Sequence, residues 1–366
     1  MKICVIGTRG FPEIQGGVEK HCESLYPLLP SEDKVIVFRR KGYVHSVQQY
    51  PNIRFIDLPS TKIKGLEAVL HSFIATIYTI FIHPDIVHIH NIGPALFSPL
   101  LTLAGIKVIL TYHSPNYEHN KWGFFAKHIL LLSEKIALSR SSSIIFVNKF
   151  QMNKYNDCIK KKSYYIPNGI QINTPTKKND YICSLGLSPQ KYILSVGRIT
   201  PEKGFDCLIK AYNLINTDCK LVIVGSIEAE SSYGNYLKKL VGTKVVVFPG
   251  YVFGERLNQL YSNAALYVLA SYNEGFPLVL LEALSYKLNV IVSDIPATHL
   301  VNLQKDDYFE KGNVKMLASK LKERLKNPQL KSYQLSEFNW QQIANNVHRI
   351  YVQTCKKKSC IVHIGD

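Results

Sequence analysis

The sequence predicts an α/β protein with two doubly wound domains, each built on a parallel sheet. First, short runs rich in β-branched residues alternate with helical segments, a pattern typical of parallel sheets that helices cover on both faces. Second, this alternation stops once, at residues 166–180, where Pro, Gly, Asn, Thr and Lys crowd together without an apolar period. Third, the 366 residues exceed the roughly 250–300 at which one hydrophobic core stops growing.

The first domain is predicted to span residues 1–170. Its most apolar helix, over 66–82, is interrupted by Glu67 and His71 and is shorter than the roughly 20 residues that a membrane span needs. We therefore expect this helix to be buried. The strands of the domain are expected at 2–6, 34–38, 53–58, 85–90, 107–112 and 143–147, and its helices near 17–29, 63–82, 94–104 and 121–139.

The second domain is predicted to span residues 185–330, because the alternation restarts after the break. A last helix, within 338–355, has Trp340 and Ile350 among apolar residues at helical spacing, so its apolar face must dock. The strands of the second domain are expected at 191–197, 220–225, 244–248, 265–270 and 289–294.

The formal charge of +17, from 44 Lys and Arg against 27 Asp and Glu, favours a partner that carries negative charge. Such a partner could be nucleic acid, an anionic membrane face or a phosphorylated substrate, and a merely lysine-rich surface would give the same charge. No zinc finger, aromatic RNA-binding motif or helix-turn-helix pattern occurs, so no nucleic-acid partner is expected. A basic helix over 121–138, with Trp122, could lie on an anionic membrane or pack on its own sheet.

The eight cysteines are scattered and form no C-x-x-C pair, which indicates reduced thiols rather than disulfides or a metal site. The opening residues, "MKICVIGTRG", read as a strand and a glycine turn rather than as a secretory signal. We therefore expect a cytoplasmic protein.

The first candidate site follows the first strand, in "GTRGFPEIQGGVEK". Gly16 and Gly17 lead into a helix whose N-terminal amides favour an anion. The segment does not read G-x-G-x-x-G, and the second strand ends in Arg39 and Arg40 where an NAD site would have an acid. An NADP-dependent oxidoreductase could use those arginines and stays an alternative.

The second candidate site is "VGRITPEKGFDCLIKAY", in which Arg198 follows a strand and Lys203 opens the next helix. Two cations on one rim can neutralise a diphosphate directly, although Arg198 could instead pair with an acid. No D-x-D occurs in the chain, so the usual carboxylate pair for a metal-held nucleotide sugar is missing. No metal site is expected.

The third candidate site is "NEGFPLVLLEAL" (273–284), which we expect to form a helix over 277–287. Glu282 would then be ionised within an almost entirely apolar helix, so it needs a partner such as ribose hydroxyls or a lysine. Glu274, on the loop before the helix, would face a sugar and a diphosphate or be solvated. Use of the two acids as a hydrolase pair is less favoured, because both come from one segment.

His113 ends the strand at 107–112 and could bond to a sugar or exchange a proton near neutrality. His88 and His90 alternate along the strand before it, and we expect both in the core.

These segments resemble the family 4 glycosyltransferases, which have the GT-B fold, and in particular a bacterial surface-polysaccharide branch that contains rhamnosyltransferases. The resemblance covers nearly the whole chain, and its specific part is the E-x7-E pair with Arg198 and Lys203 upstream. Two departures are Asn289 in "KLNVIVSD" and Leu300, where the family often has an acid. The matching segments are "IGTRGFPEIQGGVEKHCESL", "TYHS", "IPNGI", "VGRITPEKG", "FPGYV", "NEGFPLVLLEAL", "SDIP" and "YFEKGNVKMLA".

The resemblance implies two Rossmann-like domains facing a cleft, with the last helix crossing back onto the first domain. It also implies a retaining, metal-independent transfer of a sugar from a nucleotide diphosphate-sugar to an acceptor hydroxyl, without a cofactor. Arg198 and Lys203 would stabilise the leaving diphosphate, and Glu282 would bind the ribose. Glu274 would hold the donor sugar and phosphate together with the amides of Gly275, Phe276 and Leu278.

In the first domain, the resemblance implies that Gly16 and Gly17 close over the diphosphate and that His113 contacts the donor sugar. The acceptor would be a glycan or lipid-linked glycan at the inner face of the membrane, with peripheral contact to anionic lipid. Three alternatives remain at this point: a nucleotide-sugar epimerase on the same fold, the NADP-dependent oxidoreductase, and a binding protein without turnover.

Overall fold

The structure is a computed structural model, and it divides the chain into two compact units. Unit 1 comprises Met1–Gly169 and the chain from Glu337 onward, and unit 2 comprises Ile170–Ser336. The residues that the structure describes are 1–14, 16–44, 48–61, 63, 66–115, 117, 123–226, 232–326, 328 and 330–356.

Within the described residues, unit 1 contains a seven-stranded parallel sheet in the order β3-β2-β1-β4-β5-β6-β7. All the strands predicted for this part are confirmed, and β7 is an addition that its three residues were too short to reveal. The strands are β1 (Lys2–Ile6), β2 (Lys34–Arg40), β3 (Ile53–Leu58), β4 (Ile86–His90), β5 (Lys107–Tyr112), β6 (Ser143–Phe146) and β7 (Ser163–Tyr165).

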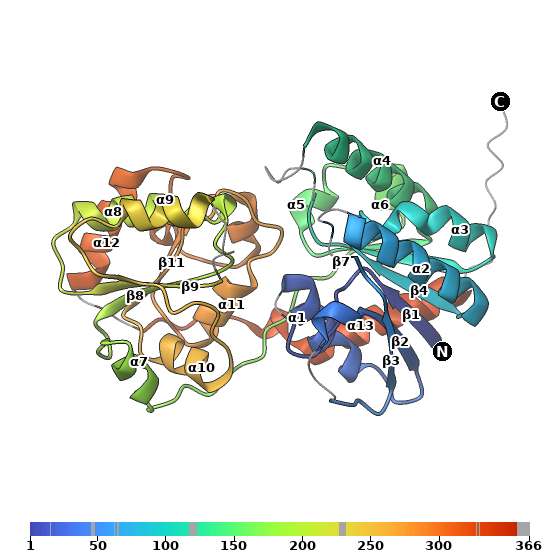
Figure 1. Cartoon of the computed structure of the whole chain (residues 1–366), viewed down its shortest axis with the longest axis horizontal. Helices are drawn as coiled ribbons and strands as arrows, with labels where there is room; N and C mark the ends of the chain where they lie inside the picture. Colours follow the sequence, from blue (N-terminus) through green and yellow to red (C-terminus); the bar gives the residue numbers. More distant parts are fainter. Residues whose placement is uncertain are drawn as a thin grey trace. The chain divides into compact units, whose positions relative to one another are not determined.

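Helices cover both faces of this sheet (Figure 1). Alternation along β1 sends Ile3 and Val5 into a core with α1 and α13, while Cys4 and Ile6 pack toward α2, α3 and α4. The helices of unit 1 are α1 (Gly17–Leu25), α2 (Leu66–Ile82), α3 (Ser98–Leu103), α4 (Phe124–Arg140), α5 (Lys149–Met152), α6 (Asp157–Lys160) and α13 (Trp340–Lys356), with 3₁₀ turns η1 (Tyr26–Leu28), η2 (Lys41–Tyr43) and η3 (Pro94–Phe97).

The prediction that 66–82 forms a helix is confirmed, but the prediction that this helix is buried is wrong. One side of α2 packs on the sheet, and the other side exposes large apolar residues such as Phe73 and Phe81. No helix in the described ranges has both the length and the hydrophobicity that crossing a bilayer requires. Lys121 and Trp122 of the predicted basic helix lie outside the described residues; the rest of that helix is α4.

Unit 2 repeats the architecture on a six-stranded parallel sheet, counted over its described residues, in the order β10-β9-β8-β11-β12-β13. The predicted strands are again present, and only β13, a two-residue strand, was not predicted. They are β8 (Tyr192–Val196), β9 (Lys220–Val224), β10 (Val246–Val247), β11 (Leu266–Leu269), β12 (Val290–Ser293) and β13 (Tyr308–Phe309).

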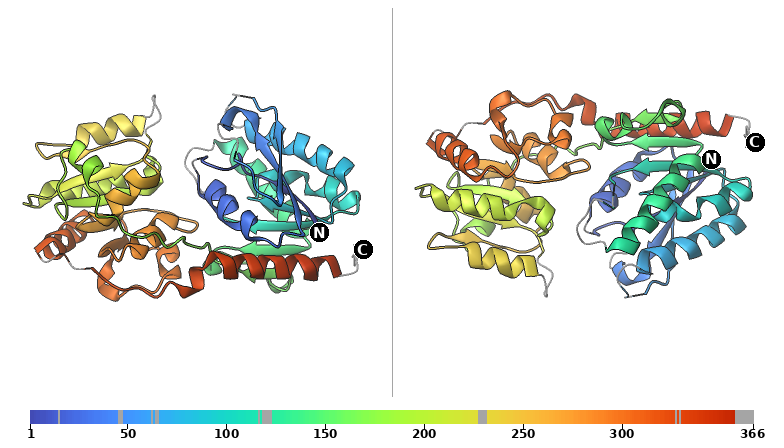
Figure 2. Two further views of the ribbon diagram at one scale, coloured as in Figure 1. Left: turned by 90° about the horizontal axis from the view of Figure 1, so that it is seen from below. Right: turned by 90° about the horizontal axis from the view of Figure 1, so that it is seen from above.

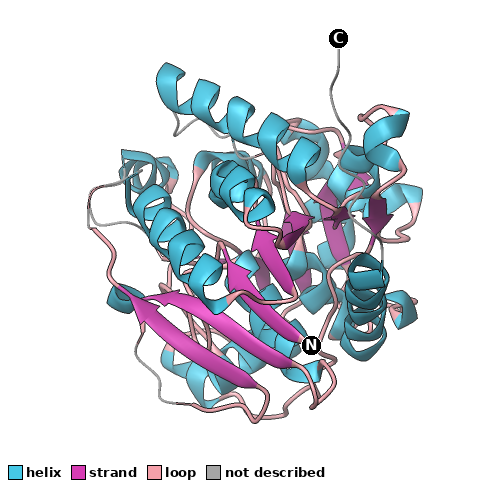
Figure 3. Ribbon diagram, turned by 90° about the vertical axis from the view of Figure 1, so that its right-hand side faces the viewer, coloured by secondary structure: helices cyan, strands magenta, loops and turns pink. Residues whose placement is uncertain are grey.

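The helices of unit 2 also lie on both sides of their sheet (Figure 1), and Figure 3 shows helices on both sides of the unit 1 strands. Asn289, which departs from the family pattern, lies buried before β12 and accepts a 2.8 Å hydrogen bond from Arg324 Nη1. The helices are α7 (Asp180–Ser184), α8 (Phe205–Leu214), α9 (Ser232–Leu240), α10 (Gly254–Ser262), α11 (Leu278–Ser285) and α12 (Val314–Lys326), with 3₁₀ turns η5 (Pro201–Lys203), η6 (Pro296–Leu300), η7 (Lys305–Asp307) and, at the boundary, η8 (Ser336–Phe338).

Both sheets reverse their strand order once, between β1 and β4 in unit 1 and between β8 and β11 in unit 2. Loops leave the carboxyl ends of neighbouring strands in opposite directions at such a switch point, which creates the crevice where doubly wound sheets bind ligands. The candidate site segments follow β1, β5, β8 and β11, so each unit presents them at or beside its switch point.

The last helix returns to unit 1, which confirms the predicted crossing. Figure 2 shows α13 (red) on the side of the unit 1 sheet away from α2 (blue). Trp340, Ile343, Val347 and Ile350 are buried in the core shared with α1. Trp340 packs so closely on Gly169 that a Cβ atom built there would lie 2.5 Å from the indole Cδ2.

We predict that Trp340→Ala lowers the free energy of unfolding by about 3 kcal/mol, because a large buried side chain leaves a cavity. Urea unfolding followed by circular dichroism checks this. Asn346→Ala, at an exposed position of the same helix, is the control and should leave the midpoint unchanged. Equal midpoints for both variants would show that α13 is not part of the cooperative core.

Candidate functional site

An ion pair joins the two loops at the switch point of unit 2. Lys203 Nζ lies 2.6 Å from Glu274 Oε1, and Ser271 Oγ donates a 2.7 Å hydrogen bond to the same oxygen. The side chains of Lys203 and Glu274 are only 15% and 9% exposed. Glu274 is therefore neither solvated nor isolated, and the cation predicted at Lys203 is already paired with a carboxylate.

The ion pair depends on a close approach of the two loops. Gly204 adopts φ +64°, and a Cβ atom there would lie 2.0 Å from the carbonyl oxygen of Ala270, just after β11. Tyr272 N–H also donates a 2.8 Å hydrogen bond to Glu202 O. Any residue other than glycine at 204 would be strained and would push the loops apart.

Arg198 differs from Lys203 because it is exposed and its side chain makes no hydrogen bond or ion pair within the part of the chain that the structure describes. The pairing with an acid that the sequence left open is thus not observed. Arg198 follows Gly197 after the end of β8, and its guanidinium can hold phosphate oxygens in a bidentate manner.

Glu282 lies on α11, on the side of the helix that is only half-buried. Its Oε2 accepts a 2.9 Å hydrogen bond from Tyr261, whose ring stacks on Tyr286 at 5.1 Å. Burial and the nearby Glu282 carboxylate raise the pKa of Tyr261 well above its usual value, so it remains a donor. A lysine and ribose hydroxyls were the partners that the sequence suggested for Glu282, and sequence spacing gave no means to find Tyr261.

The predicted start of this helix was also wrong. It begins at Leu278 rather than at Pro277, which is its N-cap, and it ends at Ser285. Leu278 N–H donates a 3.0 Å hydrogen bond to Phe276 O, so a ligand that used this amide would have to replace that bond. Gly275 and the buried Phe276 lie on the loop between Glu274 and the helix.

In unit 1, Gly16 and Gly17 lie at the N-terminus of α1, as predicted, but a carboxylate already lies beside them. A Cβ atom on Gly16, which has φ +155°, would fall 1.9 Å from Glu19 Oε2. Glu19 is buried, and its Oε1 accepts a 3.0 Å hydrogen bond from Arg9 N–H. Gly17 is exposed, and a Cβ atom built on it would have no neighbouring atom of the described residues within 4 Å.

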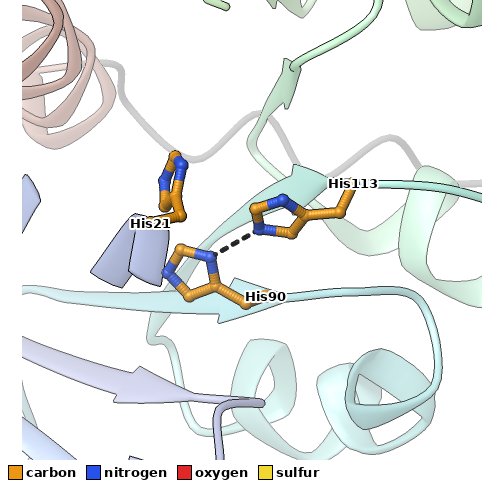
Figure 4. A group of neighbouring side chains, drawn as sticks. All are labelled: His21, His90 and His113. Atoms are coloured by element: carbon orange, nitrogen blue, oxygen red, sulfur yellow. Dashed lines mark hydrogen bonds between the residues drawn. The ribbon is translucent and has the colours of Figure 1, made fainter. Parts of the chain in front are cut away.

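His113 belongs to a buried cluster with His21 and His90 (Figure 4). His90 Nδ1 and His113 Nε2 share a hydrogen bond of 3.0 Å, and His21 Nδ1–H donates to Asn168 Oδ1 at 2.6 Å. His88 and His90 are in the core as predicted. His21 and Asn168, 147 positions apart, escaped the sequence analysis because neither belongs to a periodic pattern.

Of the two roles that the sequence left open for His113, a lowered pKa disfavours proton exchange near neutrality. Burial, followed by the neighbouring His21 and His88, holds the pKa of His113 well below its usual value. Burial likewise lowers the pKa of His21 to about 4. The cluster is therefore neutral at neutral pH and can offer a ligand hydrogen bonds but no charge.

Among the described residues, His21, His90 and His113 also form the one group of three side chains that could hold a metal ion, with ligand atoms within 4.8 Å of one another. His90 Nδ1 and His113 Nε2 are bonded to each other, His21 Nδ1 to Asn168 and His90 Nε2 to the Tyr26 hydroxyl, whereas His21 Nε2 is buried without a partner among the described residues. A metal would have to break the bond between His90 and His113, and we assign none.

Arg39 and Arg40 are each paired with a carboxylate of the chain itself. Arg39 makes two hydrogen bonds to the Asp57 carboxylate, at 2.7 and 3.0 Å, and its guanidinium lies over Phe55. Arg40 pairs with Glu67 at 3.4 Å. The observation that favoured an NADP-dependent oxidoreductase therefore has another explanation.

Two doubly wound units in one chain, each with its candidate site residues at or beside the switch point of its sheet, are the architecture of the GT-B class. A model of "Glycosyltransferase Family 4" matches residues 15–174, and a model of "Glycosyl transferases group 1" matches residues 180–338. The two matches together account for most of the chain, which belongs to the family 4 glycosyltransferases of the GT-B kind.

Individual relatives agree with this assignment. The chain is 29% identical over 247 residues to an uncharacterized glycosyltransferase of Haemophilus influenzae, an alignment covering 64% of this chain and 65% of that protein. It is 25% identical to the capsular polysaccharide biosynthesis glycosyltransferase CapM of Staphylococcus aureus, covering 57% of this chain and 58% of CapM. The chain thus matches less than two thirds of the length of either relative.

Solved structures share the fold across nearly the whole chain. Sucrose-phosphate synthase from Thermosynechococcus elongatus superposes with a TM-score of 0.79 at 21% identity, covering 96% of this chain and 98% of that one. Anabaena HepE in complex with UDP gives a TM-score of 0.74 at 15% identity, covering 96% and 100%. These similarities confirm the predicted GT-B fold.

We predict that the protein loses stability as pH falls from 6.5 toward 4. The pKa of His21 is about 4 in the folded chain and 6.5 otherwise, so the unfolded chain binds more protons across that window. His21→Asn, which cannot titrate, should lose less stability over the same range, by on the order of 2 kcal/mol. Urea midpoints measured across this range check the difference.

The control for this prediction is His128→Asn, which changes an exposed histidine on α4. It should keep the pH dependence of the wild type. If His21→Asn shows the same pH dependence of stability as the wild type, His21 does not gain a proton on unfolding, which would contradict the prediction.

Proposed function

We propose that the protein transfers a sugar from a nucleotide diphosphate-sugar to an acceptor hydroxyl, with retention at the anomeric carbon and without a metal. The observation that carries the proposal is the ion pair of Lys203 and Glu274 at the switch point of unit 2, with the exposed Arg198 on the same connection between β8 and α8 as Lys203. HepE, which shares the fold, has been solved with UDP and with UDP-glucose.

Charge stabilisation of the leaving group is the central step of this function. The bond between the anomeric carbon and the phosphate oxygen breaks, and the diphosphate gains negative charge. Arg198 and Lys203 would hold that charge, since guanidinium and ammonium donors bind phosphate oxygens without a metal. The departing phosphate would accept the proton of the acceptor hydroxyl as the new glycosidic bond forms, so a protein base is not required.

The remaining residues would orient the donor. Glu274, held by Lys203 and Ser271, would face the sugar and the diphosphate, and Glu282, oriented by Tyr261, would bind the ribose. The amides of the 275–278 loop would assist once Leu278 N–H exchanges its bond to Phe276. Gly16, Gly17 and the neutral His113 are proposed as the contributions of unit 1, as the family resemblance implies.

We propose further that the acceptor is a lipid-linked glycan and that the product is a surface polysaccharide assembled at the inner face of the membrane. CapM, a relative, is named for capsular polysaccharide biosynthesis. The net charge of +17 suits peripheral contact with anionic lipid. Two alternatives remain: a nucleotide-sugar epimerase on the same fold, which would convert donor without any acceptor, and a binding protein, which would bind nucleotide without turnover.

We predict that Glu274→Gln and Lys203→Met each lower transfer by at least about 100-fold, as expected when charge stabilisation in the transition state is lost. Release of nucleoside diphosphate from UDP-, GDP- and dTDP-sugars, with a membrane lipid extract as acceptor and EDTA present, measures the effect. Glu255→Gln and Lys238→Met, which change exposed residues of unit 2, are matched controls and should keep wild-type rates.

A double variant separates catalysis from folding. Each single change leaves one buried charge unpaired and should cost about 3 kcal/mol of stability, whereas Lys203→Met/Glu274→Gln removes both charges and should regain much of that loss. The double variant should nevertheless stay inactive. Activity that returns together with stability would mean that the pair is only structural, and wild-type turnover that needs added Mg²⁺ would contradict a metal-independent reaction.

A further inference from the structure

Helix α2 turns small and polar residues toward the sheet and exposes large apolar ones, the reverse of the arrangement expected for a helix on a buried sheet. Its buried side is small and polar, with Ser72, Thr76 and Thr79 among its residues, so the sheet receives few of its large apolar side chains. Those side chains lie on the opposite half of the helix and range from 38% to 85% exposed. They are Leu66, Val69, Leu70, Phe73, Tyr78 and Phe81.

The apolar surface continues across the neighbouring helices. α2 packs against α3 and η3, and both of these pack against α4, so the helices form one layer on this side of unit 1 (Figure 1). Leu103 of α3 is 84% exposed. The outward half of α4 adds five large side chains that are 38% to 82% exposed, namely Phe124, Phe125, Ile129, Leu131 and Leu132. We call the outward side of α2, α3 and α4 the apolar face.

The charges on the apolar face have one sign. Lys135 and Arg140 are exposed on α4, and Lys127 is half-buried there. The carboxylates described between residues 66 and 140 are all engaged elsewhere. Glu67 binds Arg40 and Tyr43, Glu134 is buried under three tyrosines, and Asp85 accepts from the Lys2 amide.

We propose that the apolar face docks on the surface of an anionic lipid bilayer. The face combines broad aromatic and aliphatic exposure with cations and lacks competing carboxylates among its described residues, which is the composition of surfaces that lie in the headgroup region. This inference rests on the proposed function, because it identifies the part of the chain that brings the transferase to a lipid-linked acceptor.

The charge pattern argues against a second copy of the chain as the occupant. In a two-fold interface the same patch meets itself, so Lys135, Arg140 and Lys127 would approach their own counterparts without intervening carboxylates from the described part of the face. An anionic lipid surface instead complements those cations while it receives the apolar side chains.

The test measures sedimentation of the full chain with vesicles of phosphatidylcholine alone or of phosphatidylcholine mixed with phosphatidylglycerol. We expect binding to the mixed vesicles that weakens as NaCl is raised. Phe81→Ser/Phe125→Ser/Leu132→Ser should weaken binding by at least about tenfold, because each buried methylene contributes to partitioning. The matched control, Ile172→Ser/Leu214→Ser/Phe253→Ser, changes similarly exposed residues of unit 2 and should bind like the wild type.

A charge series tests the second half of the proposal. Lys127→Gln/Lys135→Gln/Arg140→Gln should weaken binding and flatten its salt dependence, whereas Lys238→Gln/Lys239→Gln/Lys315→Gln in unit 2 should not. The proposal would be overturned if the variants of the apolar face bound vesicles like the wild type. It would also be overturned if either of them lost no more vesicle binding than its matched control in unit 2. A wild-type dimer in light scattering that the apolar-face variant abolishes would assign the face to a second copy.

Circular dichroism and nucleotide binding keep this test independent of folding and of the proposed activity. The apolar-face variants should keep the wild-type melting temperature and the wild-type response to nucleoside diphosphates without vesicles. Vesicle binding without any nucleotide response would contradict the transferase and leave the docking face standing. A nucleotide response without vesicle binding would contradict the docking face and leave the transferase proposal standing.

Discussion

The ion pair between Lys203 and Glu274 is the interaction on which the site of unit 2 depends. It joins the loops that leave β8 and β11, the two strands at which the strand order reverses. Gly204 makes the approach possible, because its missing side chain lets the first loop contact the backbone of Ala270. The diphosphate site that we propose combines this nearly buried, charge-balanced pair with the exposed Arg198, which lies on the same connection between β8 and α8 as Lys203.

The two units offer a ligand different chemistry from the same position in the same fold. Unit 2 presents charged groups whose geometry is set by hydrogen bonds from Ser271 and Tyr261. Unit 1 presents histidines that burial keeps neutral, in a network that ends at Asn168. A neutral donor and acceptor set suits sugar hydroxyls, whereas the cations suit phosphate. The apolar face of unit 1, by contrast, combines exposed apolar side chains with cations, and it is the surface that we propose to dock on lipid.

Much of this architecture could be predicted because it follows from local periodicity. Runs of β-branched residues gave nearly all the strands, and the loops that follow them gave Arg198, Lys203 and Glu274. Two side-chain pairs could not be predicted, Tyr261 with Glu282 and Asn168 with His21, since their members meet only through the tertiary fold. The burial of α2 was predicted wrongly because composition shows that a helix is apolar but does not show which of its sides meets the sheet.

The most direct test of the diphosphate site is a calorimetric titration of the wild type, Arg198→Ala and Arg198→Lys with UDP, GDP and dTDP. If the site is as proposed, one nucleoside diphosphate binds the wild type, Arg198→Ala loses most of the affinity, and Arg198→Lys keeps only part of it because a lysine cannot bind two oxygens in the same plane. Arg256→Ala, at an exposed arginine of unit 2, should bind normally. Equal affinity in the wild type and Arg198→Ala, or no binding of any of the three nucleotides, would contradict it.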